Sequence, residues 1–158
     1  MNSTLRNVLV ASLGGAAALA IALPLLPAGG ATTTITPAGT TELATQMDGQ
    51  QEVPPADPNG VGDAFVFGTS SDPQALCYAV IVDRMGTPLA AHIHHGAVGV
   101  ENPPAVPLKT PTDGDSAGCV QVRARLVTRI LNNPQNWYVN VHNAKFPDGA
   151  IRGQLAAR

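Results

Sequence analysis

The sequence predicts an all-β domain, an antiparallel β-sandwich or barrel of about eight strands with one short helix or 3-10 turn. Short runs rich in β-branched and aromatic residues follow one another along the chain, and clusters of Pro, Gly, Asn and Asp separate them. Several runs alternate apolar and polar residues, which is the pattern of a strand with one buried face. We therefore expect antiparallel strands rather than βαβ units.

Eight segments have the character of strands. They are Glu42 to Met47, Gly62 to Thr69, Ala75 to Asp83, Leu89 to His94, Ala105 to Leu108, Gly118 to Ala124, Trp137 to His142 and Ala150 to Leu155. In the third, Ala75 to Asp83, both alternating sets of residues are apolar, so we expect a central strand. Only Leu126 to Asn133 has helical spacing, and we expect Pro134 to end this short helix or 3-10 turn.

The last two predicted strands form the clearest hairpin. Apolar and polar positions alternate from Trp137 to His142, and the polar set contains Tyr138, Asn140 and His142. The segment from Pro147 to Gly149 then turns the chain back into the final strand. His142 is therefore expected on a polar face, beside a tight loop.

The first 31 residues have the pattern of an export signal. Arg6 and the terminal amine supply positive charge, an uncharged apolar run extends from Val8 to Leu26, and small residues up to Ala31 offer a cleavage site. We expect cleavage after Ala31 and export to the periplasm, the cell surface or the medium. The alternative is an uncleaved membrane anchor, because the apolar run is about as long as a short bilayer span. Residues 32–41 then form a flexible lead-in and residues 42–158 a single domain.

Charge and cysteine content narrow the partners and the compartment. Eleven acidic residues outnumber nine basic ones, which argues against nucleic acid or an anionic membrane as a partner. Arg123, Arg125 and Arg129 cluster in the sequence, and we interpret them as a solvated face. Cys77 and Cys119 are the only cysteines, and in an exported chain we expect them to form a disulfide, with two buried free thiols as the alternative.

Three segments resemble the CHRD domain family, namely GQQEVPP (Gly49 to Pro55), AAHIHHGAVG (Ala90 to Gly99) and YVNVHNAKFPDGAIRGQL (Tyr138 to Leu155). They come in the order and approximate spacing of that family, over roughly Glu42 to Leu155. The family is named for chordin, a secreted antagonist of bone-morphogenetic-protein ligands, and many of its bacterial members are exported single domains. The resemblance implies an extracytoplasmic all-β domain and implies little about activity, because a fold does not supply a function.

The chain departs from the family pattern in two places. His95 and then ENPPAV stand where the family generally has a short glycine-rich turn followed by Gly-Pro-Val-Val. Ala150 stands where the family generally has an acidic residue before Ile-Arg-Gly. Any role that the family gives to that carboxylate is absent here.

Three of the four histidines lie within four consecutive positions. His92 and His94 are two positions apart, so both imidazoles of an extended strand project to the same face, while His95 points away or enters the turn. His142 is the remaining candidate for a third ligand. Because imidazole suits copper and zinc, we predict a three-histidine site for one such ion, with an open coordination position. In the competing interpretation the histidines are polar strand residues that only form hydrogen bonds.

Other residues are candidates to support this site. His95 is a possible additional ligand or outer donor, and Glu52 is a possible acceptor that orients an imidazole. Arg152 is a possible partner of Glu52 or of a bound anion. The alternative for Glu52 and Arg152 is a structural ion pair that fixes the N-terminal strand against the last one. Tyr138 and Asn140 share the face of His142, so they either line the same pocket or pack across strands.

Together these features predict an exported CHRD-type binding module with a copper or zinc ion as its partner. One alternative is a mononuclear copper redox enzyme, because HxH followed by a glycine-rich turn resembles the copper-binding strand of copper/zinc superoxide dismutases. Four histidines do not suffice for a full dismutase site, and the sequence contains neither an HExxH helix nor a phosphate-binding loop. The other alternative is a metal-free domain for adhesion or for interaction with an extracellular protein.

Overall fold

The computed structural model describes residues 40–158, which form an antiparallel β domain. Its elements, in chain order, are β1 (Thr40–Asp48), η1 (Gly49–Gln51), β2 (Val61–Thr69), β3 (Asp72–Asp83), β4 (Pro88–His95), β5 (Pro104–Leu108), β6 (Asp115–Gln121), α1 (Ala124–Asn132), η2 (Pro134–Asn136), β7 (Trp137–Asn143), β8 (Ile151–Gln154) and β9 (Ala156–Ala157). The strands form one sheet in the order β5-β4-β7-β8-β1-β2-β3-β6, and β9 pairs with β1.

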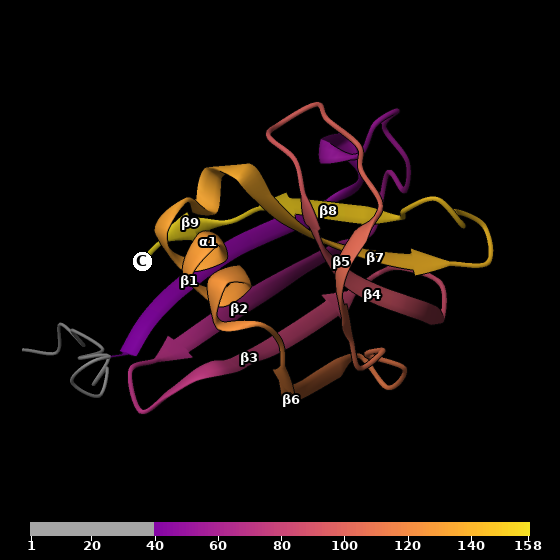
Figure 1. Cartoon of the computed structure of the whole chain (residues 1–158). Helices are drawn as coiled ribbons and strands as arrows, with labels where there is room; N and C mark the ends of the chain where they lie inside the picture. The colour runs from indigo at the N-terminus through magenta and orange to yellow at the C-terminus, as the bar shows by residue number, and fades with distance from the viewer. Residues whose placement is uncertain (1–39) are drawn as a thin grey trace, which may run out of the picture. The chain divides into compact units, whose positions relative to one another are not determined.

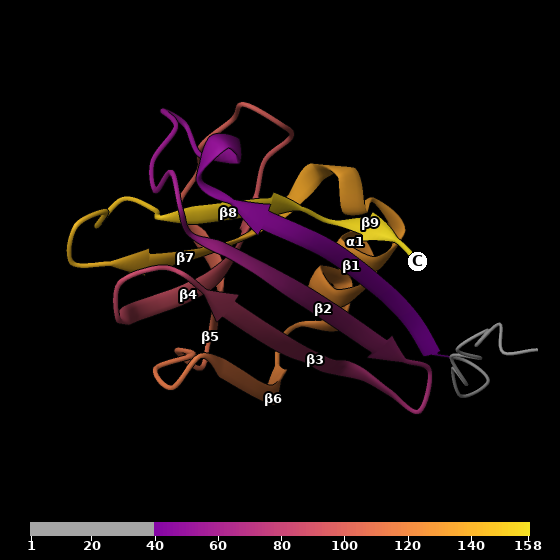
Figure 2. The same ribbon diagram turned by 180° about the vertical axis from the view of Figure 1, so that it is seen from behind.

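The sheet curls into a nearly closed, barrel-like form (Figures 1 and 2). Two hydrogen bonds connect the end of β5 to the opposite edge. The backbone N–H of Lys109 donates to Tyr78 Oη on β3 at 2.7 Å, and Ser116 Oγ on β6 donates to the Lys109 carbonyl at 2.7 Å. These bonds hold the end of β5 beside β6, the strand at the other edge of the sheet. The all-β prediction is confirmed in its barrel form.

Ser116 is also the centre of GDSAG, which has the Gly-x-Ser-x-Gly spacing of a hydrolase nucleophile. That motif requires a sharp turn between a strand and a helix, whereas Ser116 lies inside β6. Its side chain is 4% exposed and bonds to a backbone carbonyl. Its role here is therefore structural.

Alternation along the strands separates an apolar interior from an outer face. The fully buried large side chains of the interior include Leu43, Met47, Val66, Leu76, Val80, Ile93, Val106, Val139 and Ile151. Helix α1 packs chiefly against β3 and contributes Val127 and Ile130 to the same core. Because each buried aliphatic side chain contributes about 1.5–3 kcal/mol, this continuous core is the main source of stability.

The observed bounds differ from the predicted ones around α1. The predicted strand Gly118 to Ala124 ends instead at Gln121, because α1 already begins at Ala124. Pro134 follows the helix as expected and starts η2, where the first turn has no need of the missing N–H. The expected helix is thus confirmed with shifted ends.

The expectation that Ala75 to Asp83 forms a central strand is confirmed, because β3 pairs with β2 on one side and with β6 on the other. One face lies in the core, but Ile81 on the other face is 49% exposed. Two of the apolar residues on that outer face have other reasons to be there. Cys77 is joined to Cys119, and Ala79 is small. An apolar face of a central strand is therefore not always covered by another layer.

The expected disulfide between Cys77 and Cys119 is confirmed. The two cysteines lie directly opposite each other in the antiparallel register of β3 and β6, with an S–S distance of 2.03 Å. The bond closes 42 residues of chain, which in the chain-entropy model is worth about 4 kcal/mol. A disulfide fits an oxidising compartment.

The predicted signal and most of the lead-in lie outside the described residues. Within residues 40–158, no helix has the length and apolar character needed to cross a bilayer.

Candidate metal centre

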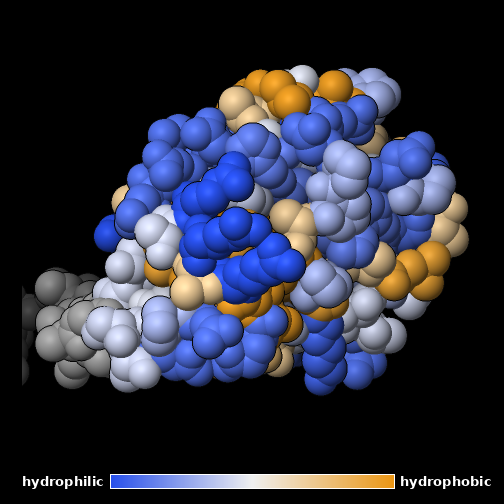
Figure 3. Space-filling model, in the orientation of Figure 1, coloured by the Kyte–Doolittle hydropathy of each residue, from blue (hydrophilic) through white to orange (hydrophobic). Residues whose placement is uncertain are grey.

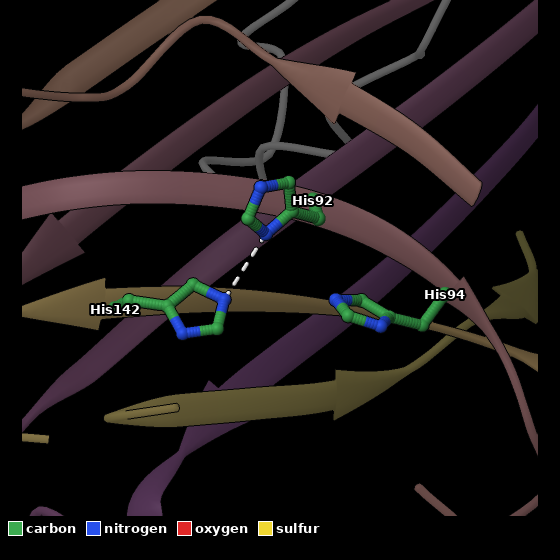
Figure 4. A group of neighbouring side chains, drawn as sticks. All are labelled: His92, His94 and His142. Atoms are coloured by element: carbon green, nitrogen blue, oxygen red, sulfur yellow. Dashed lines mark hydrogen bonds between the residues drawn. The ribbon is translucent and has the colours of Figure 1, made fainter. Parts of the chain in front are cut away.

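The structure brings His92, His94 and His142 together on the outer face of two neighbouring strands (Figure 4). His92 and His94 lie on β4, and their spacing of two places both rings on one face of the sheet. β7 pairs antiparallel with β4, with Asn140 opposite His92 and His142 opposite Ala90. One ring nitrogen from each histidine lies within 4.8 Å of the other two.

Hydrogen bonds to backbone carbonyls fix the orientation of two of these rings. His94 Nδ1 lies 2.7 Å from the Asn102 carbonyl, and His142 Nδ1 lies 2.9 Å from the Pro147 carbonyl. Because a carbonyl only accepts, each of these bonds requires the ring proton on Nδ1. Nε2 of His94 then keeps its lone pair, as a metal ligand requires. Nε2 of His142 does so too in this tautomer, but Asn140 Oδ1, which lies 3.1 Å away and also only accepts, favours the tautomer with the proton on Nε2.

The His92 ring faces the other two rings with its Nδ1 atom, whereas His94 and His142 face inward with Nε2. His92 Nδ1 lies 3.0 Å from His142 Nε2, and this contact is drawn as a dashed line in Figure 4. His92 Nδ1, His94 Nε2 and His142 Nε2 are thus the facing atoms. Three nitrogens at about 2.0–2.1 Å from a common ion lie roughly 3.3 Å apart, so the 3.0 Å pair already has nearly that spacing.

His94 Nε2 is fully buried and makes no hydrogen bond of ordinary length among the described residues, although the Asn140 side chain is near enough to raise the pKa of His94. Three other side-chain atoms within residues 40–158 are buried without a partner, namely Glu52 Oε1, Arg152 Nη1 and Gln154 Oε1. The whole side chain of His94 is 5% exposed. A buried polar atom without a partner costs about 1–3 kcal/mol, so proteins rarely keep one without a reason. The position of His94 Nε2 next to two other imidazole nitrogens makes it available as a ligand atom.

The local environment holds all three rings in the neutral state. Burial, with the neighbouring His142 and His94, lowers the pKa of His92 to about 4. Burial likewise lowers the pKa of His94 and of His142, in each case against the effect of the carbonyl that accepts from the ring. Neutral imidazole is the form that binds metal.

A stack of side chains supports His94 from the side. The His94 ring lies parallel to the Tyr138 ring, with centroids 4.8 Å apart and planes at 9°. The guanidinium carbon of Arg152, on β8, lies 3.4 Å from the centre of the Tyr138 ring. Arg152 is 1% exposed and donates from Nη2 to the Ala97 carbonyl at 2.9 Å. Tyr138 and Arg152 therefore restrict the orientation of the His94 ring.

Asn140 connects the histidines to Glu52. Its Oδ1 atom lies 3.1 Å from His142 Nε2, and its side chain also lowers the pKa of the Glu52 carboxyl. Glu52 is 6% exposed, and burial raises its pKa to about 7, against the opposing charge of Arg152. Glu52 thus reaches the histidines through an amide and makes no direct contact with an imidazole.

The expected ion pair between Glu52 and Arg152 is not formed. Within residues 40–158 the ion pairs join Arg84 to Asp83 and Arg158 to Glu42. Arg152 instead donates to the Ala97 carbonyl and lies over the Tyr138 ring. It acts on Glu52 through its charge, which lowers the Glu52 pKa.

The structure does not bring His95 to the site. Its ring lies edge-on against Trp137, with centroids 4.9 Å apart, and the residue is exposed. The neighbouring position on a strand points to the other side, as the alternation of strand residues requires.

Sequence reasoning missed the residues that surround the facing nitrogens. A cleft of about 460 Å³ opens over the site and is lined by Val53, Pro54, His94, Glu101, Asn102, Pro104, His142, Pro147 and Asp148. Asn102 and Pro147 act through backbone carbonyls, which carry no sequence signal. Pro147 and Asp148 were recognised only as part of a turn.

Comparisons with known proteins agree with this fold. The CHRD domain family matches residues 43–155 of the chain. No curated protein and no solved structure matches it. The family match spans β1 to β8 and includes all three facing histidines. The chain therefore belongs to the CHRD domain family.

Proposed function

We propose that this domain is an extracytoplasmic binding module that holds one copper or zinc ion through His92, His94 and His142. The observation that carries the proposal is the buried, unpartnered Nε2 of His94 beside the facing nitrogens of the other two rings. Three neutral imidazoles suit copper and zinc and leave a fourth coordination position open. The disulfide and the membership of the family support export.

The choice between a binding module and a copper redox enzyme depends on access to the open position. The cleft above His94 and His142 is large enough for a small molecule, which favours the enzyme as a second candidate. An enzyme also needs a metal that cycles between oxidation states. A metal-free interaction domain, by contrast, gives no reason for His94 Nε2 to stay buried without a partner.

Metal analysis of the purified protein tests the proposal. We expect one equivalent of copper or zinc after loading and dialysis, and none for the variant that carries His92→Ala, His94→Ala and His142→Ala together. His95→Ala is the matched control, because this histidine lies outside the site and should leave the stoichiometry at one. Full stoichiometry in the triple variant would refute the site. Catalysed turnover of superoxide or of a reductant by the copper form would select the enzyme.

A further inference from the structure

Two carboxylates stand at the rim of the cleft that leads to the histidines. Glu101 lies in the connection between β4 and β5, and Asp148 lies in the loop between β7 and β8. Both are exposed. No lysine or arginine is among the residues that line this cleft. Lys145 lines the adjoining pocket together with Glu101 and Asp148, and the buried Arg152 acts on His94 through its charge. The rim of the cleft itself therefore carries two negative charges.

The floor of the cleft distinguishes it from an ordinary acidic surface. His94 and His142 both line the cleft, and Nε2 of His94 is a buried atom without a partner that lies near the other two rings. Acidic rims are common on proteins, but this one borders a cleft that two of the three facing histidines line. A ligand that the rim attracts therefore has a group to bind at the bottom.

We propose that Glu101 and Asp148 steer the metal into the three-histidine site, so that the site is loaded by cationic forms of the metal and discriminates against anionic chelates. This inference rests on the proposed function. The two carboxylates are positioned to attract the cation on approach, and they are not ligands in the final site, because neither belongs to the group of converging ligand atoms.

The physical effect belongs to the association step. Charges that line a cleft raise the local concentration of an oppositely charged ligand, and the effect weakens as salt shortens the screening length to about 10 Å at 0.1 M. Removing the two charges should slow association of a divalent ion about three- to tenfold at low ionic strength. The dissociation rate should hardly change, because the bonds to the imidazoles are untouched.

Stopped-flow measurement of copper binding, followed by fluorescence of Trp137 and the tyrosines, tests this. The variant Glu101→Gln/Asp148→Asn should bind the hydrated Cu²⁺ ion more slowly than the unmodified protein, and the difference should vanish in high salt. With the Cu²⁺–nitrilotriacetate monoanion as the metal source, the same variant should load as fast as the unmodified protein or faster. A merely structural role of the two residues would slow both sources alike.

The matched control is Asp113→Asn/Asp115→Asn. It removes the same charge from two exposed residues that do not line the cleft, and it should leave both rates unchanged. The inference is overturned if the cleft variant loads hydrated Cu²⁺ at the unmodified rate, or if the control variant slows as much. If the unmodified protein binds no metal at all, the proposed function fails together with it. If the protein binds metal at equal rates in all variants, only the steering is refuted.

Discussion

Two hollows on this domain differ in size and in what lies beneath them. The larger, about 840 Å³, lies at the start of α1 and is lined by Gln74, Gln121, Val122, Arg123, Arg125, Leu126 and Arg129. Figure 3 shows strongly hydrophilic residues gathered over this helix. The smaller, about 460 Å³, lies above the histidines. Residues 40–158 contain a buried, unpartnered ring nitrogen only beneath the smaller hollow.

The two hollows therefore differ in chemistry more than in size. The same helix carries Val127 and Ile130, which are core side chains, so α1 contributes to the stability of the fold. The arginine side chains themselves remain in contact with solvent and need no partner, as the sequence interpretation expected. Near the histidine cleft, by contrast, His94 Nε2 is a buried polar atom. Such an atom lowers the stability of the fold unless it makes a hydrogen bond or binds a ligand.

Ile130→Ala should give the largest effect on stability. This side chain is fully buried under α1, and its truncation should cost about 2–5 kcal/mol of the free energy of unfolding. The metal affinity of the folded fraction should stay the same, because the histidines lie on β4 and β7 and not on α1. Urea unfolding and metal titration at low temperature measure the two quantities. A loss of affinity would show that the two regions are coupled.

His94→Ala should weaken metal binding, whereas Ile130→Ala should weaken only the stability of the fold. Removing a direct ligand should weaken metal binding roughly 100-fold or more, since even outer contacts to a ligand are worth about 10–100-fold. The variant Arg123→Gln/Arg125→Gln/Arg129→Gln is the control from the larger hollow and should bind as the unmodified protein does. Titration against a metal indicator compares them. Weakened binding in the arginine variant would move the site, or part of it, to α1.

Tyr138→Leu should weaken metal binding about tenfold, because the His94 ring loses the aromatic face on which it stacks. Tyr138→Phe keeps that face and should bind almost normally. The same titration separates the two variants. Equal affinities would show that stacking does not position His94.

The pH dependence of stability should be the smallest effect. Unfolded histidines gain a proton below about pH 6.5, whereas burial holds the pKa of His92 at about 4 in the fold. The unfolded state then binds more protons, so His92 lowers the stability of the metal-free protein as the pH falls from 6.5 towards 4. His92→Asn should reduce this loss in urea unfolding, and Arg125→Gln should not. Parallel curves for His92→Asn and the unmodified protein would contradict the assignment.

Glu52 affects the pH dependence of stability in the opposite direction to His92, over a similar pH range. Its pKa is raised from 4.5 to about 7, so the folded state binds more protons between these values. The contribution of Glu52 to stability is therefore lost as the pH rises from 4.5 to 7. Glu52→Gln should gain stability relative to the unmodified protein over this interval, and the same unfolding series at each pH measures it. A constant difference would mean that Glu52 titrates normally.

Much of the fold could be predicted because strand alternation is a local property. The alternation from Trp137 to His142 correctly placed Trp137, Val139 and Val141 in the core. The sheet order could not be predicted, because it depends on how distant segments share one core. The short β9 also escaped, since two alanines carry no strand signal. The exposure of Ile81 was missed because composition does not reveal whether another layer covers a face.

For the site, the sequence by itself determined that His92 and His94 share one side of a strand and that His142 lies on the polar side of another. It also determined that two cysteines were available for one disulfide. Only the tertiary structure decided that β4 and β7 are neighbours in a register that places His92 Nδ1 3.0 Å from His142 Nε2 across 50 residues of sequence. The physical reason is that side-chain direction follows from the strand period, whereas strand pairing and register are fixed by the burial of the whole apolar face. The carbonyls of Asn102 and Pro147, which orient two of the rings, were likewise set by loops that only the folded barrel brings over the histidines.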